Sequence, residues 1–183
     1  MVMRILNIVD EGGKIVGEDT RKNIHSKGLL HREIHVWFYT PKKEIIFQLR
    51  GKNKDTFPNL LDATVGGHVE IGEDFWDAAL KEMSEETGVR ARKDDLKLIT
   101  KLRKTAKDPV TKMTNNVIRA VYAYEYKGKL DGLQVEGNKA QGFEKWSVNQ
   151  LIKGLSQVEK KRFIPSMLNN EYIEIYKRIL KLG

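Results

Sequence analysis

Hydrophobic and polar residues follow two different periods along this 183-residue chain. Short apolar runs that are rich in β-branched and aromatic residues and bounded by turn residues are typical of strands. We expect strands at Met3–Val9 and Ile15–Gly17 (a hairpin), Glu33–Thr40, Glu44–Arg50, near Ala63–Val65, Leu96–Arg103 and Val117–Tyr126. These runs lie on both sides of one long stretch with helical periodicity.

The clearest helical pattern covers Glu73–Thr87, and Gly88 supplies its C-terminal stop. Its apolar positions, spaced i, i+3, i+4 and i+7, are Trp76, Ala79, Leu80 and Met83. A short helix is predicted after Ser147 as N-cap, and a final amphipathic helix from Pro165 through Leu182. Strand pairs around a helix, with more helices at the end, predict an α+β fold with a mixed sheet.

The length suits one domain, residues 1–183, in which residues 1–32 form an N-terminal elaboration and residues 165–182 a C-terminal helix. No apolar run approaches the roughly 20 residues that span a bilayer. The first ten residues do not have the pattern of a signal peptide, so a cytoplasmic protein without a membrane partner is expected.

The chain contains 33 basic and 25 acidic residues, which gives a net charge of +8. This excess raises the local concentration of anions and fits either a lysine-rich solvated surface or a nucleic-acid partner. No long basic block is interleaved with aromatic residues, and this disfavours nucleic acid. The absence of cysteine excludes a disulfide scaffold, a zinc ribbon and a cysteine nucleophile.

Three glutamates, Glu82, Glu85 and Glu86, stand at i, i+3 and i+4 of the predicted helix. This spacing places them within about 100° of one another, beside the apolar stripe. A solvated acidic face is the alternative, but like charges and the helix C-terminus both disfavour the cluster. A hard dication such as Mg²⁺ or Mn²⁺ would turn these repulsions into attraction.

The segments Gly67–Glu73 (GHVEIGE) and Lys81–Val89 (KEMSEETGV), seven residues apart, resemble the Nudix box. Every fixed position matches except Lys81, where the family has arginine. The resemblance implies a Nudix-type α/β/α sandwich with a mixed sheet, and an enzyme that hydrolyses a phosphate–phosphate bond with bound Mg²⁺ or Mn²⁺.

By the same resemblance, Glu82, Glu85 and Glu86 would bind the metal together with the carbonyl of Gly67 or its neighbour Gly66. Glu73 would pair with Lys81 and support the loop–helix geometry. Lysine lacks the bidentate fork of arginine, so we expect this replacement to tune the site.

The metal-bound water needs a group that accepts its proton. Glu85, with Glu82, is the catalytic candidate within the helix, and the later acids Glu136 and Glu144 remain alternatives. Many relatives have a glutamate six residues before the tryptophan that is Trp146 here, where this chain has Ala140.

The substrate is expected to be a small, nucleotide-derived diphosphate, and a homodimer is compatible with the sequence. Arg50 and Lys54 could hold the diphosphate, although in so basic a chain either could be plain surface. Aromatic residues that could stack on a base, unless they belong to the core, are Trp37, Phe38, Tyr39, Phe57 and Trp146.

Residues 5–150 also resemble, more loosely, the isopentenyl-diphosphate isomerase subgroup. The residues that carry this resemblance are His25–Arg32, Gln48–Arg50, Lys54, Pro58 and Gly67–His68. True isomerases have a cysteine where this chain has Gly66, and glutamates in the stretch matching Thr114–Val117 (TNNV). Without these proton-handling groups, isomerase activity is not expected.

His25, His31 and His68 match histidines that bind a metal in those isomerases. They would form a second metal site here, or they are inherited loop residues that make hydrogen bonds. A non-catalytic nucleotide- or RNA-binding Nudix module is a further alternative, which the retained glutamate cluster disfavours.

Overall fold

The computed structural model describes residues 4–54 and 56–182, so Met3 of the predicted hairpin lies outside the described residues. The strands are β1 Ile5–Val9, β2 Ile15–Thr20, β3 His31–Tyr39, β4 Glu44–Arg50, β5 Leu61–Asp62, β6 Val65–His68, β7 Leu96–Lys107, β8 Thr114–Glu125 and β9 Ala140–Ser147. The helices are α1 Arg21–Lys27, α2 Phe75–Thr87, α3 Val148–Lys153, α4 Gln157–Lys160 and α5 Asn170–Leu180. Among the described residues, no helix is long and apolar enough to cross a membrane.

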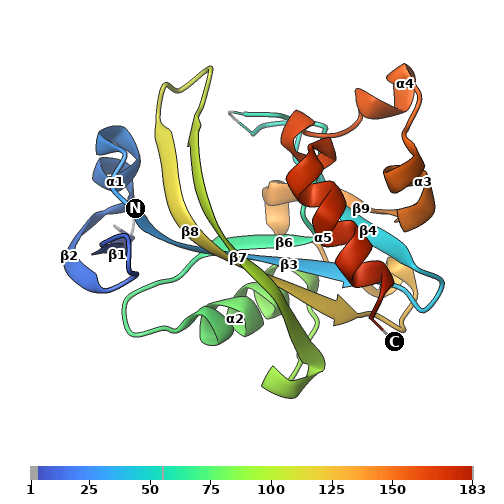
Figure 1. The fold of residues 1–183 in the computed structure, drawn as a ribbon, viewed down its shortest axis with the longest axis horizontal. Helices are drawn as coiled ribbons and strands as arrows, with labels where there is room; N and C mark the ends of the chain where they lie inside the picture. Colours follow the sequence, from blue (N-terminus) through green and yellow to red (C-terminus); the bar gives the residue numbers. More distant parts are fainter. Residues whose placement is uncertain (1–3, 55, 183) are drawn as a thin grey trace.

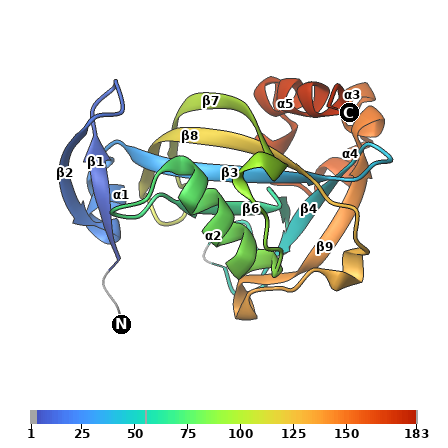
Figure 2. The same cartoon turned by 90° about the horizontal axis from the view of Figure 1, so that it is seen from below.

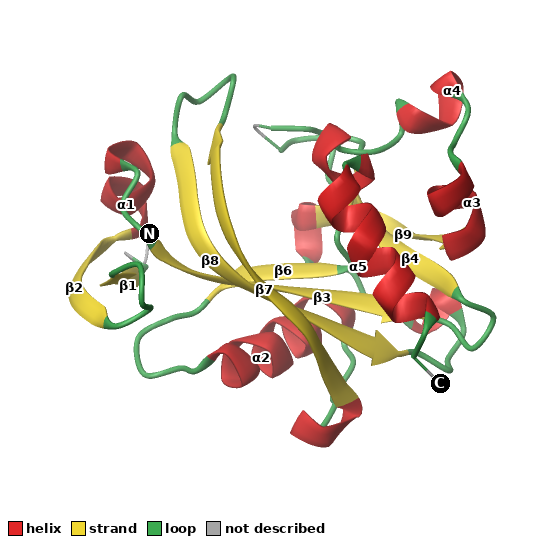
Figure 3. Cartoon of the chain, viewed as in Figure 1, coloured by secondary structure: helices red, strands yellow, loops and turns green. Residues whose placement is uncertain are grey.

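Within the described residues, seven strands form one mixed sheet, which Figure 3 shows in yellow. Its order is β5-β4-β3-β8-β7, with β6 paired to β3 and β9 paired to β4. β3 and β8 run parallel, whereas the other neighbours are antiparallel. The predicted hairpin is confirmed as the separate pair β1–β2, which lies with α1 at one end of the molecule (Figure 1).

The pleat of β3 divides the core into two layers. Ile34, Val36 and Phe38 lie in the cluster that packs against α2. Trp37 and Tyr39 point to the opposite face, into the cluster formed with α3 and α5. Successive side chains of a strand point to opposite faces, so a strand buried on both sides is apolar at both sets of positions. Figure 2 shows α2 and α5 on opposite sides of the sheet, and the predicted α/β/α sandwich is confirmed.

Helix α2 matches its prediction closely because both of its ends are capped. Asp74 accepts from the backbone N–H groups of Trp76 and Asp77, and the Asp77 side chain accepts from the backbone N–H of Asp74. This reciprocal arrangement is a capping box. At the other end, Gly88 takes the left-handed conformation with φ 72°.

The predicted C-terminal helix is wrong at its start. Pro165–Leu168 forms a 3₁₀ turn, and α5 begins only at Asn170, with Asn169 as its N-cap. The Asn169 side chain accepts from Tyr172 N at 3.0 Å. This N-cap places the start of the helix after Asn169 and not at Pro165. The helix ends at Leu180, two residues before the predicted end.

A buried ion pair joins the two parallel central strands. Glu33 of β3 and Arg119 of β8 stand opposite each other in register. Arg119 donates to Glu33 Oε2 from Nη2 at 2.8 Å and from Nε at 3.1 Å. The Glu33 and Arg119 side chains are only 12% and 10% exposed, so each charge is stabilised mainly by its partner and little by water.

We therefore predict that Arg119→Met destabilises the protein by about 3–5 kcal/mol, because it leaves the Glu33 carboxylate buried without its partner. Urea unfolding monitored by circular dichroism measures this change. The double variant Glu33→Gln/Arg119→Met should recover most of the loss, since neither position then carries a charge. A double variant no more stable than the single one would contradict this account.

Candidate active site

A polar cavity of about 390 Å³ lies between α2, β3, β4 and β6. Its acidic lining residues are Glu33, Asp62, Glu82 and Glu86, and its basic ones are Arg4, Arg21, Arg50, Lys54 and Lys139. His35, Gln48, Ala63, Gly66, Gly67 and His68 complete the lining. The cavity therefore brings carboxylates and cations together, which suits an anionic ligand accompanied by a metal cation.

Glu82 and Glu86, one helical turn apart on α2, reach this cavity from a mostly buried position. Their exposed fractions are 6% and 9%. A Cβ atom at Gly67 would lie 2.3 Å from Glu82 Cδ. The Glu82 carboxylate therefore occupies the space that the side chain of any other amino acid at position 67 would need. Glu86 accepts from Gly66 N at 3.3 Å and from Gln48 Nε2 at 3.4 Å.

Burial makes the charged forms of these two carboxyl groups unfavourable in the metal-free protein. Burial, assisted by the negative charge of Glu85, raises the pKa of Glu82 to about 7. Burial and the neighbouring Glu82 raise the pKa of Glu86 to about 8. Two adjacent carboxyl groups with such pKa values hold protons that a divalent cation would displace.

The third glutamate of the predicted cluster lies elsewhere. Glu85 is exposed on the same helix and is not among the residues that line the cavity, although its charge acts on Glu82. The other candidate bases are engaged in ion pairs, Glu136 with Lys139 and Glu144 with Arg162, each at 2.5 Å. The metal-binding and base roles of Glu85 stay predictions.

The predicted ion pair between Glu73 and Lys81 is present, and its role in supporting the site stays a prediction. Lys81 Nζ lies 2.7 Å from Glu73 Oε1 and also 2.9 Å from Glu70 Oε2. Glu73 in turn accepts from Glu70 N through its other oxygen at 2.9 Å. A lysine cannot offer a planar fork, but its ammonium group here contacts two carboxylates at once.

The two predicted phosphate-binding residues both line the cavity. Arg50 donates to Asp62 Oδ2 at 2.8 Å and to the Thr56 carbonyl at 2.9 Å, so its guanidinium is held in place. Lys54 is half-buried, and burial lowers the pKa of its ammonium group. Their role as phosphate ligands stays a prediction.

None of the aromatic residues considered as a base-stacking surface lines this cavity. Trp37, Phe38 and Tyr39 are buried in the two core layers, with exposed fractions of 5% or less. Trp146 packs against Phe163, with ring centroids 4.9 Å apart.

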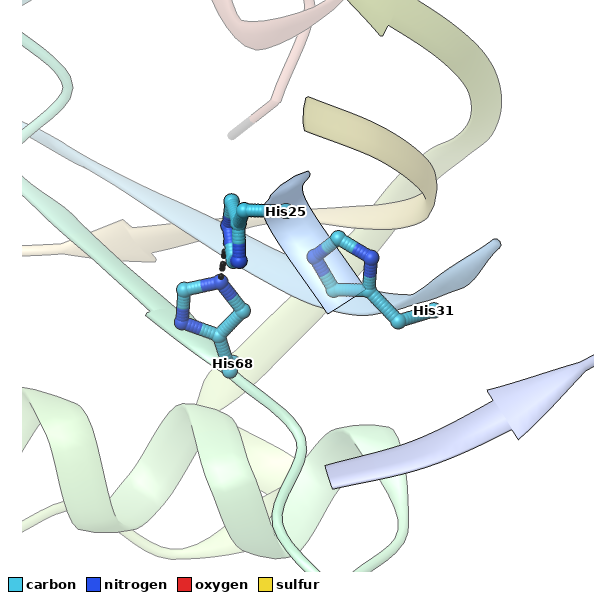
Figure 4. A group of neighbouring side chains, drawn as sticks. All are labelled: His25, His31 and His68. Atoms are coloured by element: carbon cyan, nitrogen blue, oxygen red, sulfur yellow. Dashed lines mark hydrogen bonds between the residues drawn. The ribbon is translucent and has the colours of Figure 1, made fainter. Parts of the chain in front are cut away.

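The three histidines, for which a second metal site and hydrogen-bonding loop residues were the two alternatives, lie together, from α1, β3 and β6 (Figure 4). One ligand atom of each lies within 4.8 Å of the others, and His25 Nε2 is 3.3 Å from His68 Nε2. Burial lowers the pKa of all three rings, that of His68 to about 3, which favours the neutral, ligating form of imidazole.

Two polar residues of β3, Glu33 and His35, were missed as site residues. Burial opposes the ionisation of Glu33, but Arg119 outweighs it and holds the pKa of Glu33 well below its usual range. Burial lowers the pKa of His35 to about 4. The available signal was a charged residue and a histidine that alternate with the first apolar residues of a strand buried on both faces.

Comparison with known proteins matches a NUDIX domain to residues 29–167. The chain belongs to the Nudix hydrolase family. An uncharacterized Nudix hydrolase of Clostridium acetobutylicum is 27% identical over 180 residues, which cover 97% of this chain and 86% of that relative. This Nudix protein is thus a pyrophosphohydrolase by family.

Solved Nudix structures share the fold at low sequence identity. A Deinococcus radiodurans crystal structure aligns with a TM-score of 0.68 and 20% identity, over 95% of this chain and 98% of that one. The NUDIX domain of Shewanella oneidensis NrtR, complexed with ADP ribose, aligns with a TM-score of 0.57 and 13% identity, over 83% of this chain and 88% of that one. At these identities the likeness shows the fold alone.

The raised pKa values predict how the stability of the metal-free protein depends on pH. A carboxyl group whose pKa is higher in the folded state stabilises that state fully below about 4.5, its value in the unfolded chain. This contribution is lost as the pH rises through the folded values of about 7 and 8. The free energy of unfolding should therefore fall by a few kcal/mol from pH 5 to 8, because each pKa unit is worth about 1.4 kcal/mol.

Urea unfolding in the presence of a chelator, at a series of pH values, measures this slope. Glu82→Gln/Glu86→Gln should flatten it, whereas Glu174→Gln, at an exposed position of α5, should leave it unchanged. Parallel profiles for the wild type and the double variant would show that these two groups do not titrate as described.

Proposed function

We propose that this Nudix hydrolase cleaves a diphosphate linkage in a nucleotide-derived or similar small molecule, with Mg²⁺ or Mn²⁺ as cofactor. The metal ligands in this proposal are Glu82, Glu85, Glu86 and the carbonyl oxygen of Gly67. The observation that carries the proposal is the cavity itself, where two buried carboxyl groups face a set of basic side chains. A metal–diphosphate complex has the complementary distribution of charge.

The donor set fits a hard dication. Mg²⁺ and Mn²⁺ prefer carboxylate and carbonyl oxygens, and they retain water ligands. Within the described part of the chain, no hydrogen-bond donor reaches the Glu82 carboxylate, so its oxygen lone pairs lack protein partners. When bound, such an ion neutralises charge on the phosphate oxygens and makes an attached water more acidic.

The side chains of this protein would divide the remaining work. Arg50 and Lys54 would hold the phosphate groups, and Asp62 keeps the Arg50 guanidinium oriented toward the cavity. Glu85 is the proposed acceptor of the proton from the attacking water. The fold likeness to the NrtR domain complexed with ADP ribose supports a nucleotide-derived substrate.

Glu86→Gln tests the catalytic part of the proposal. The change keeps the size and the hydrogen bonds of the side chain but removes a negative charge, so Mg²⁺-dependent release of phosphate or nucleoside monophosphate should fall by at least about 100-fold. The assay uses a panel of nucleotides, dinucleotide polyphosphates, nucleotide sugars and coenzymes. Glu174→Gln is the matched control and should retain full activity.

Binding of Mn²⁺, followed by electron paramagnetic resonance, separates the three proposed carboxylate ligands. Glu82→Gln, Glu85→Gln and Glu86→Gln should each weaken Mn²⁺ binding. If the wild type turns over no compound of the panel, the proposed hydrolysis is wrong. If only Glu85→Gln binds Mn²⁺ normally, Glu85 is not a ligand.

A second proposal concerns the cluster of His25, His31 and His68, as a separate site for a transition metal such as Zn²⁺. His25 Nδ1 donates to the Arg21 carbonyl at 2.8 Å, and His31 Nδ1 donates to the Leu29 carbonyl at 3.0 Å. With the proton on Nδ1, Nε2 of both rings has a lone pair that can bind a metal, as in metal-binding histidines. His31 Nε2 is buried without a partner among the described residues.

Metal analysis after dialysis against Zn²⁺ tests this second site without reference to activity. We expect His31→Ala to lose one equivalent of bound Zn²⁺ relative to the wild type, because it removes the most buried of the three ligands. His35→Gln, at the histidine outside the cluster, should retain that equivalent. Equal Zn²⁺ content in the wild type and His31→Ala would contradict the proposal.

A further inference from the structure

His35 lies in the wall of the candidate active site but belongs to neither the glutamate cluster nor the histidine cluster. Its side chain projects from β3 toward the layer of α5 and is 6% exposed. Even so, it is one of the residues that line the cavity. A polar side chain this deeply buried needs partners, and one of its two ring nitrogens has one.

A chain of hydrogen bonds reaches His35 from the buried ion pair. Arg119 Nη1 donates to the Tyr172 hydroxyl oxygen at 2.5 Å. Arginine has donors only, so the Tyr172 hydroxyl accepts this bond and keeps its own proton free to donate. The only other partner of that hydroxyl among the described residues is His35 Nδ1, at 3.5 Å.

This arrangement determines which ring nitrogen of His35 carries the proton. If Nδ1 were protonated, the Tyr172 hydroxyl would have no acceptor for its buried proton, and such an unsatisfied group is unfavourable. The favoured state therefore has Nδ1 as acceptor and the proton on Nε2. The ring stays neutral, because it is buried beside the Arg119 cation.

The Nε2 atom of the ring lies beside Gly66, which lines the same cavity. Among the described residues this nitrogen has no hydrogen-bond partner, and it lies 3.5 Å from the point where a Cβ atom on Gly66 would stand. The absence of a side chain at Gly66 therefore leaves the N–H uncovered. The same glycine donates its backbone N–H to Glu86, so His35 and Glu86 both lie beside Gly66 of β6.

We propose that His35 is a substrate-binding residue, whose neutral Nε2–H donates to a phosphoryl oxygen of the diphosphate, and that Tyr172 is the positioning residue that fixes its tautomer. This inference rests on the proposed function, because it assigns a ligand to the same cavity. A neutral donor holds a phosphoryl oxygen without repelling a metal cation nearby. With its proton on Nε2, His35 is not the base that accepts a proton from water.

Nitrogen-15 NMR of the histidine side chains tests the tautomer directly. In the wild type the His35 signals should show Nδ1 unprotonated and Nε2 protonated. Tyr172→Phe removes the donor to Nδ1, so both tautomers should become populated. The matched control is Tyr176→Phe, one turn further along α5, whose hydroxyl donates to the Met167 carbonyl and leaves the His35 signals unchanged. A wild-type ring protonated on Nδ1 would overturn the inference.

The second measurement uses methylenediphosphonate with Mg²⁺ as a diphosphate that cannot be hydrolysed at its bridge. Calorimetry records whether it binds, and the same NMR spectra record whether His35 Nε2–H shifts with saturation. Binding with that shift supports the inference. Binding without any change at His35 overturns the role of His35 alone, whereas a complete absence of binding overturns the proposed function together with it.

Kinetics then compare variants of both residues. We expect His35→Ala to lower kcat/KM by about 100-fold, the lower end of the scale for losing one preorganised donor, and His35→Gln to restore part of it through its amide N–H. Tyr172→Phe should lower kcat/KM several-fold, and Tyr176→Phe should not. Should His35→Ala fail to fold, the two tyrosine variants still decide the matter: equal activity in both would contradict the positioning role.

Discussion

The close approach of α2 to β6 is the contact on which the active site depends. At Gly67 the strand has no side chain, and the carboxylate of Glu82 fills the space within 2.5 Å of where a Cβ would stand. The helix can then bring its acidic residues against the backbone, beside main-chain N–H and C=O groups. A larger residue at this position would hold the carboxylates away from the strand and outside the cavity.

The electrostatics of the cavity follow from that contact. Burial makes the ionisation of Glu82 and Glu86 unfavourable, while basic side chains from β4 and from the N-terminal region surround the same space. Among the described residues, Glu82 and Glu86 form no ion pair with these basic side chains, and the close partner of Arg50 is Asp62. The proposed dication and diphosphate would complement both sets of charges.

Much of this arrangement could be predicted from local sequence. The apolar periodicity of residues 73–87 indicated the helix, and the resemblance to the Nudix box implied the Glu73–Lys81 ion pair, because both depend only on one helix and the loop before it. The exposure of Glu85 could not be predicted, since it depends on how far the helix rotates against the sheet. His35 also escaped prediction, because its partners come from β8 and α5, which only the tertiary fold brings together.

Short or weakly patterned elements were missed for a different reason. Helix α1 buries only Ile24, so it shows almost no apolar periodicity, and β9 is interrupted by Gly142. These elements are stabilised mainly by tertiary contacts. Local propensity is a weak guide in such cases.

The parallel pairing of β3 with β8 has a consequence for how the enzyme is assembled. Glu33 and Arg119 are 86 residues apart in the chain, and Tyr172 is a further 53 residues beyond Arg119. Contacts of such long range form slowly, because the loop-closure entropy is lost before they stabilise the chain. The part of the cavity wall held by the Glu33–Arg119–Tyr172 contacts should therefore become ordered late in folding. A chain growing on the ribosome would form it only after nearly all of its residues have emerged.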